Sequence, residues 1–207
     1  MKLWFTWRFE GLENVPKEGP AILACNHISY LDPLGNAYAV IEAGRRPRFL
    51  AKLDLFAIPL VGTVLRGARQ IPVDRSKAGD PSPLLSAQEA LRAGEVVVIY
   101  PEGTVTNNPD STPMPAKTGA VRLSLATGVP IVPMASWGSQ AVWQKSGMGS
   151  LKFGRPVWVK AGPPIDLSAH ADERDQRAVL RKLTADVMAE ISTLVEDLRT
   201  RYPKRWS

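Results

Sequence analysis

The sequence predicts an α/β fold, in which helices cover a mostly parallel β-sheet and a single domain spans residues 1–207. Short apolar runs alternate with helical segments, three of these helical segments are followed by a glycine, and a long amphipathic helix lies near the end of the chain. With 207 residues, of which 44% are apolar, the chain can bury one sizeable core. We therefore expect no second independent domain.

Five apolar runs predict the strands of the sheet, and several of them are too apolar to have a solvated face. They are Ala21–Cys25, Arg48–Ala51, Val96–Tyr100, Pro130–Met134 and Pro156–Lys160. Three helices are expected between them, at Pro33–Ala43, Pro83–Ala93 and Ala116–Thr127. Glycine readily adopts the left-handed conformation that ends a helix, and the glycines that follow these helices are Gly44, Gly94 and Gly128.

The last helix is expected over Glu173–Arg201, where apolar residues recur at helical spacing. This apolar stripe consists of Val179, Leu180, Leu183, Val187, Ile191, Leu194, Val195 and Leu198. Its spacing is that of a helix packed on a core, and its charged face is available to a membrane or a partner. The segment Asn107–Pro115, dense in proline, asparagine, serine and threonine, is expected to be a loop.

The composition bounds the classes of site and partner. The formal net charge of +6 favours contact with an anionic partner: a phosphate-bearing substrate, an acidic lipid, an acidic carrier protein or nucleic acid. One cysteine excludes an internal disulfide, and two histidines with one cysteine argue against a zinc site. Residues 1–10 lack the apolar core of a signal peptide, and no apolar run approaches the roughly 17 residues that a membrane-spanning helix needs. We therefore expect a cytoplasmic protein.

A histidine lies five residues before an aspartate, at His27 and Asp32. Imidazole titrates near about 6.5, which suits it to take a proton at neutral pH, and a carboxylate on its second nitrogen orients the ring and stabilises the imidazolium. His27 can therefore be a general base and Asp32 its partner. The segment joins a predicted strand to a helix that Asp32 and Pro33 are expected to cap and begin, so the turn can bring the pair into contact. The alternative is a helix cap beside an ordinary loop histidine.

Two further segments carry chemistry. The turn after the third predicted strand contains Glu102 and Gly103, and ligands of open α/β sheets bind where strands end. Glu102 supplies a charged acceptor, and Gly103 lets the backbone approach a substrate closely. Arg69 and Arg75 flank Ile71-Pro72, and the planar guanidinium of arginine suits phosphate binding. Taken singly, the turn with Glu102 and Gly103 could be only a tight loop, and the two arginines only a solvated surface.

Together these blocks resemble those of the glycerolipid acyltransferases, a family typified by 1-acyl-glycerol-3-phosphate acyltransferase. Asn26-His27 through Asp32 is similar to the N-H-x-x-x-x-D block of that family, and residues 67–75 to its second block, which ends in a substrate-binding arginine. Pro101–Thr104 resembles the third block and Val129–Pro133 the fourth, with Lys117–Ala120 similar to the lysine-glycine-alanine step that precedes it. Four blocks in the order of the family, over about residues 20–135, are far more specific than any one of them.

The resemblance implies an acyl transfer without an acyl-enzyme, a metal or a bound cofactor. His27, held by Asp32, would deprotonate a hydroxyl of a lysophospholipid acceptor, most typically 1-acyl-glycerol-3-phosphate. The oxygen would then attack an acyl thioester of coenzyme A or acyl carrier protein, giving phosphatidic acid. The implied substrate-binding residues are Arg69, Arg75, Glu102, Gly103, Thr104 and Lys117.

Individual roles follow from the same resemblance. Arg75 would hold the phosphate of the acceptor, and Glu102 would order the glycerol or Arg75 itself. The Gly103 amide is a candidate donor to the developing oxyanion. The weakly polar segment Leu55–Leu65 is the candidate groove for the acyl chain.

The chain departs from the family in two places. Val105-Thr106 follow the third block, where family members often carry arginine and serine, so the acceptor could be another glycerolipid or a glycolipid. Many members also have hydrophobic N-terminal helices, whereas this sequence begins almost at the catalytic region. Peripheral attachment to the inner face of an anionic membrane is therefore expected, through Leu55–Leu65, through basic residues, or through the aromatic N-terminus. The basic residues are Arg45, Arg46 and Arg48. The aromatic residues are Trp4, Phe5, Trp7 and Phe9, and packing in the core is the alternative for them.

Two other classes of function are alternatives for this sequence. A serine or cysteine hydrolase would use His27 to activate a nucleophile, and Cys25 is the nearest candidate; the chain has no G-x-S-x-G elbow. A non-enzymatic binder of anionic lipid or nucleic acid would rest on the net charge, but no regular stripe of basic and aromatic residues indicates a nucleic-acid face.

Overall fold

A seven-stranded sheet forms the centre of the computed structural model, which describes residues 4–74, 76 and 80–206. The strands lie in the order β1-β9-β6-β2-β5-β3-β4, and their pairings are parallel except for that of β6 with β9. Their bounds are β1 Phe5–Glu10, β2 Ala21–Cys25, β3 Pro47–Lys52, β4 Ile71–Val73, β5 Val96–Ile99, β6 Ile131–Trp137 and β9 Arg155–Ala161. The predicted mostly parallel sheet is confirmed, and β1 and β4 are additions to the predicted strands.

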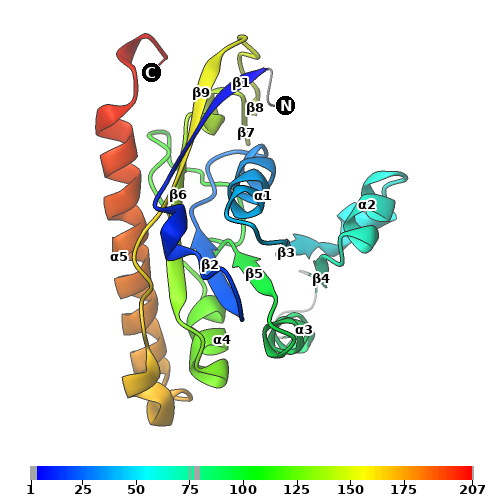
Figure 1. Cartoon of the computed structure of the whole chain (residues 1–207), viewed down its shortest axis with the longest axis vertical. Helices are drawn as coiled ribbons and strands as arrows, with labels where there is room; N and C mark the ends of the chain where they lie inside the picture. Colours follow the sequence, from blue (N-terminus) through cyan, green and yellow to red (C-terminus); the bar gives the residue numbers. More distant parts are fainter. Residues whose placement is uncertain (1–3, 75, 77–79, 207) are drawn as a thin grey trace.

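Helices cover both faces of this sheet (Figure 1). The helix α1 (Asp32–Glu42) lies on one face, and α3 (Ser82–Arg92), α4 (Gly119–Thr127) and α5 (Arg177–Arg201) lie on the other. Successive side chains of a strand point to opposite faces, so Leu23 and Val98 pack on the α1 side while Ile22 and Val97 pack on the other. Because both faces are buried, these strands carry continuous apolar runs without polar alternation.

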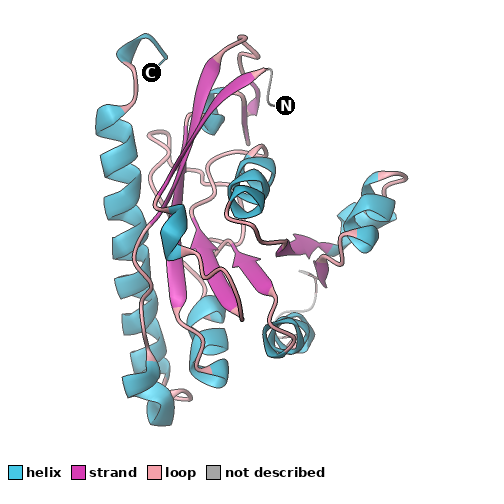
Figure 2. Cartoon of the chain, viewed as in Figure 1, coloured by secondary structure: helices cyan, strands magenta, loops and turns pink. Residues whose placement is uncertain are grey.

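The helix ends follow the predicted stop signals. Gly44, Gly94 and Gly128 have φ angles of 80°, 75° and 70° and stand directly after α1, α3 and α4 or one residue later. The starts are less well predicted: α4 begins at Gly119 instead of Ala116, because the Lys117 amide donates to the Pro101 carbonyl at 2.9 Å. The helix α5 begins after a 3-10 helix, η4 (Ser168–Glu173), and runs along one side of the sheet (Figure 2).

The N-terminal aromatic residues belong mainly to the core. Phe5, Trp7 and Phe9 lie on β1, an edge strand that pairs in parallel with β9, and Trp4 directly precedes it. Phe5 is buried, and the rings of Trp7 and Phe9 pack edge-on against Tyr38 of α1. Trp4 remains 48% exposed and packs on Phe153. Core packing therefore accounts for most of this cluster.

Part of the chain leaves the sheet beyond β5. The strand β3 pairs with β5 through Pro47–Phe49 and then with β4 through Leu50–Lys52. Between β3 and β4 the chain forms a 3-10 helix, η2 (Leu53–Ala57), and α2 (Val61–Gly67), which project from the body of the molecule (Figure 1). We call residues 53–67 the arm. None of the described helices has the length and apolarity needed to span a membrane.

The remaining short elements support the loops around the strand ends. A two-stranded hairpin, β7 (Trp143–Gln144) and β8 (Gly147–Met148), contacts the turn after β2, where the Tyr30 amide donates to the Trp143 carbonyl at 3.1 Å. Three further 3-10 helices are η1 (Leu12–Asn14), η3 (Ser139–Ala141) and η5 (Lys204–Trp206). Residues 107–115 form the predicted loop.

Candidate active site

The candidate site lies where two neighbouring strands end. The strands β2 and β5 are adjacent and parallel, with Ala24 paired to Ile99, so the segments that follow them emerge at the same edge. The segment after β2 carries His27, and the segment after β5 carries Glu102 and Gly103. The fold thus brings together residues that are far apart in the sequence.

His27 and Asp32 are in contact, as the sequence predicted. The Nδ1 atom of His27 lies 3.0 Å from Oδ2 of Asp32, and this carboxylate is 1% exposed. The same oxygen accepts the backbone amides of Ile28 and Ser29 at 2.7 Å each, and Oδ1 accepts the Ser139 hydroxyl at 2.5 Å. Four donors therefore fix the carboxylate, and Nε2 is the imidazole nitrogen left to take a proton.

The prediction that Asp32 caps its helix was wrong. The N-cap residue of α1 is Leu31, and Asp32 is the first residue of the helix. Its carboxylate turns back toward the preceding turn and binds the amides of that turn, so no side-chain cap bond forms. Asp32 therefore stabilises the loop that carries His27, in addition to orienting the ring.

Glu102 supports His27 from the opposite side. Its Oε1 accepts the His27 amide at 2.8 Å, its Oε2 accepts the Met114 amide at 2.9 Å, and the residue is 6% exposed. Burial raises the pKa of the Glu102 carboxyl, and the two amide bonds oppose that shift. Because both oxygens are engaged and Glu102 does not line the cavity described below, its geometry fits holding the loop and not direct contact with substrate.

The Gly103 turn is closed by its own hydrogen bond. The Gly103 amide donates to the Tyr100 carbonyl at 2.9 Å, so it is not free to serve as the predicted oxyanion donor. The φ angle of Gly103 is 73°, and a Cβ atom there would stand 3.3 Å from Cε of Lys117. Glycine is therefore needed for the backbone conformation and for the approach of Lys117. Thr104 follows this turn without lining the cavity.

A buried polar network behind His27 was missed at the sequence level. The ring of Tyr100 stacks on the imidazole with 4.2 Å between centroids, and its hydroxyl accepts from Asn36 at 3.0 Å. Asn36 in turn accepts the Ser136 hydroxyl at 2.9 Å. Asn36 lies one helical turn after Asp32, on the same face of α1, and this spacing is the signal that could have indicated it.

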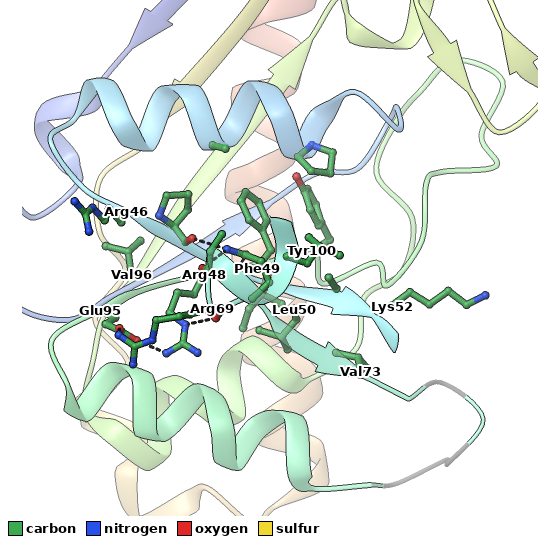
Figure 3. A pocket seen from close by; sticks show the side chains of 18 of the residues that line it. Arg46, Arg48, Phe49, Leu50, Lys52, Arg69, Val73, Glu95, Val96 and Tyr100 are labelled. Carbon is green, nitrogen blue, oxygen red and sulfur yellow. Dashed lines mark hydrogen bonds and ion pairs between the residues drawn. The ribbon is translucent and has the colours of Figure 1, made fainter. Parts of the chain in front are cut away.

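An open cavity of about 1000 Å³ adjoins the pair. His27, Tyr100, Gly103 and Lys117 line it near the strand ends, together with apolar residues of α1 and β3. Figure 3 shows Arg46, Arg48 and Arg69 gathered near Glu95, apart from Tyr100. The Arg69 guanidinium pairs with Glu95 at 2.9 Å, so Arg69 lies away from His27. Arg75 lies outside the described residues.

Cys25 is not placed as a nucleophile. Its side chain is fully buried, and burial raises the pKa of the thiol well above its ordinary value. Among the residues that the structure describes, no group of three or more His, Cys, Asp or Glu side chains is arranged to hold a metal ion.

Residues 6–137 match the sequence family described as Acyltransferase. The chain belongs to the acyltransferase family. A 1-acyl-sn-glycerol-3-phosphate acyltransferase of Bacillus subtilis is 31% identical to this acyltransferase over 188 residues, which cover 90% of this chain and 88% of the relative. The chloroplastic 1-acyl-sn-glycerol-3-phosphate acyltransferase BAT2 of Brassica napus is 30% identical over 147 residues, covering 70% of this chain and 41% of the relative.

The fold has a solved counterpart. The crystal structure of the 1-acyl-sn-glycerophosphate (LPA) acyltransferase PlsC from Thermotoga maritima superposes on this acyltransferase with a TM-score of 0.70 and 28% identity. The match covers 96% of this chain and 74% of that one. The chain thus spans most of the bacterial relatives but less than half the length of the plant relative. Family membership and the buried Cys25 both weigh against the hydrolase alternative.

Proposed function

We propose that this acyltransferase transfers a fatty acyl group from a thioester to the free hydroxyl of 1-acyl-glycerol-3-phosphate, forming phosphatidic acid. One observation carries the proposal: His27, fixed by a buried carboxylate, faces a cavity whose described lining contains no serine, threonine or cysteine. Among the described lining residues the base therefore has no serine, threonine or cysteine to activate, and we assign a hydroxyl of the substrate as its partner. The relatives named above support the choice of acceptor.

The proposed reaction is a direct displacement. Nε2 of His27 takes the proton of the acceptor hydroxyl, and the oxygen attacks the thioester carbonyl carbon. The tetrahedral intermediate collapses, the carbon–sulfur bond breaks, and the thiolate leaves and takes the proton back from the imidazolium. The Asp32 carboxylate stabilises that imidazolium throughout, and general-base help of this kind is worth about 10² to 10⁴ in rate.

The acceptor phosphate needs cations near His27. Lys117 lines the cavity beside Gly103, which supports its role as one of these cations. Arg75 is the second, on the strength of its place in the block that resembles the substrate-binding block of the family.

The donor and the membrane complete the proposal. The thioester of coenzyme A or acyl carrier protein serves as co-substrate, and no bound cofactor takes part. The enzyme contacts the inner face of an anionic membrane peripherally through the arm. Support comes from the apolar residues of the arm: Leu60 is 82% and Val64 68% exposed, while Leu55 and Leu65 line the cavity. A lipid acceptor could thus pass from the bilayer to the site without crossing water.

The activity test uses purified enzyme with 1-acyl-glycerol-3-phosphate and either acyl-CoA or acyl carrier protein thioester, and product masses are measured. We expect phosphatidic acid from the parent enzyme and a rate lower by about 10² to 10⁴ in His27→Ala, whose thermal melt should stay close to that of the parent. Transfer to a neutral glycerolipid or a glycolipid but not to the phosphorylated acceptor would reject the proposed acceptor. Parent-like turnover in His27→Ala would reject the base.

The membrane test compares exposed apolar residues of the arm, residues 53–67, with one of α3. Leu60→Asp/Val64→Asp should lose co-flotation with anionic phosphatidylglycerol vesicles, because charged side chains oppose insertion. Leu85→Asp on α3, where Leu85 is 53% exposed, is the matched control and should still float. Equal flotation of both variants would show that the arm is not the contact.

A further inference from the structure

Three arginines line one end of the cavity, and two of them share a single carboxylate (Figure 3). The guanidinium groups of Arg48 and Arg69 both pair with Glu95, and Nε of Arg48 also donates to the Arg69 carbonyl at 2.6 Å. Arg46 is exposed beside them, and the Arg69 side chain is 70% exposed. One carboxylate is thus shared by two guanidinium groups, and Arg46 adds a third positive charge, so the three arginines outnumber the carboxylate that pairs with them.

This cluster lies far from the catalytic base. The Ala21 amide donates to the Glu95 carbonyl at 3.3 Å, which places Glu95 level with the start of β2. His27 follows the end of that strand, and the rise from Ala21 to Cys25 alone is about 13 Å at about 3.3 Å per residue. The cavity spans this length, since Pro33 at the start of α1 and Ile41 near its end both line it.

The separation decides which substrate can reach the arginines. In 1-acyl-glycerol-3-phosphate the phosphate is attached to the carbon next to the one that bears the free hydroxyl. When that hydroxyl is at His27, its phosphate cannot also be at Arg69. In a thioester donor the reacting group lies far from the phosphate, because the long pantetheine chain separates the sulfur from the nearest phosphate.

We propose that Arg46, Arg48 and Arg69 form a subsite for the phosphate groups of a phosphopantetheine thioester donor. Arg48 is held by its bonds to Glu95 and Arg69 and positions the cluster, while the exposed Arg46 and Arg69 bind phosphate oxygens. The pantetheine chain of the donor lies along the part of the cavity between β3 and α1, and its thioester reaches His27. Arg69 thus keeps a substrate-binding role, but for the donor and not for the acceptor. The subsite rests on the proposed function, since it assigns the donor of that reaction.

Binding of coenzyme A without an acyl group tests the subsite independently of turnover. Calorimetry should show coenzyme A binding to the parent enzyme and affinity lower by about tenfold or more in Arg46→Ala/Arg69→Ala, because charge-assisted hydrogen bonds are lost. Pantetheine, which has the same chain but no phosphate, should bind the parent and the double variant alike. Arg177→Ala is the matched control: Arg177 is an exposed arginine at the start of α5 and does not line the cavity. Thermal melts of all variants establish that they are folded.

A second experiment uses holo and apo acyl carrier protein, which differ only by phosphopantetheine. Binding of holo but not apo protein, weakened in the double variant, would identify a carrier protein as the source of the phosphate. Equal affinity of the parent and the double variant for coenzyme A and for holo carrier protein, or no binding of either of these two by the parent, would overturn the subsite. If phosphatidic acid still forms in that case, the proposed function stands without it. If the affinity of the double variant for coenzyme A or for holo carrier protein falls as expected but no lysophospholipid is acylated, the subsite stands and the acceptor assignment fails.

Discussion

Replacing Asp32 by asparagine separates the charge of this residue from its hydrogen bonds. An asparagine can place its amide oxygen at the position of Oδ2, where it still accepts the amides of Ile28 and Ser29 and a proton on Nδ1 of His27. Its amino group then faces Ser139, whose hydroxyl can rotate to accept a hydrogen bond. The loop geometry is therefore kept, and the negative charge beside the imidazole is removed.

The expected effects on rate and stability differ in size. Loss of the carboxylate leaves the imidazolium of His27 uncompensated in the transition state, so kcat should fall by about 10² to 10⁴. The three bonds at the Oδ2 position change from charge-assisted to neutral, which costs about 1 kcal/mol each, and the lower cost of burying a neutral group offsets part of this. A net loss of about 1 to 2 kcal/mol should lower Tm by about 2 to 8 °C.

Steady-state acylation of 1-acyl-glycerol-3-phosphate and thermal melts are measured for His27→Ala, Asp32→Asn and the double variant. Since Asp32 acts through His27, the double variant should be no slower than His27→Ala. Ser139→Ala, which removes only the Oδ1 bond, is the structural control and should keep most of the activity. Rate losses that multiply in the double variant, or an Asp32→Asn rate close to that of the parent, would refute the pairing.

Three further predictions test other parts of the structure. Cys25→Ala should keep parent-like turnover, since the thiol is fully buried; loss of turnover together with an acyl-enzyme in the parent would restore the hydrolase mechanism. Tyr100→Phe keeps the ring that stacks on His27 and should retain most of kcat, whereas Tyr100→Ala should lower kcat by more than tenfold; equal kcat values would reject the stacking role. Hydrogen bonds from Arg201 and Lys160 lower the pKa of Asp197 from 3.8 to about 2. The ionised carboxylate therefore stabilises the folded state at pH values above 3.8, and this contribution is lost as the pH falls toward 2. Asp197→Asn should therefore flatten the fall of Tm between these pH values, and an unchanged slope would contradict the assignment.

Local signals in the chain were sufficient for most of the fold. Strands buried on both faces require continuous apolar runs, so β2 was predicted at its observed bounds. Glycines at left-handed positions ended α1, α3 and α4 as expected. The edge strands β1 and β4 were not predicted, because β1 pairs only with the distant β9, and β4, three residues long, only with β3. Such pairing depends on partners that a local pattern does not contain.

The sequence by itself determined the contact between His27 and Asp32, because the two residues lie five apart across one turn. The tertiary structure decided how the other predicted site residues are arranged. Glu102 turns inward to the amides of His27 and Met114, and Arg69 lies beside Glu95 at the far end of the cavity. Both outcomes depend on which strand ends meet and on which buried amides need an acceptor, and these are properties of the assembled sheet and not of any one segment.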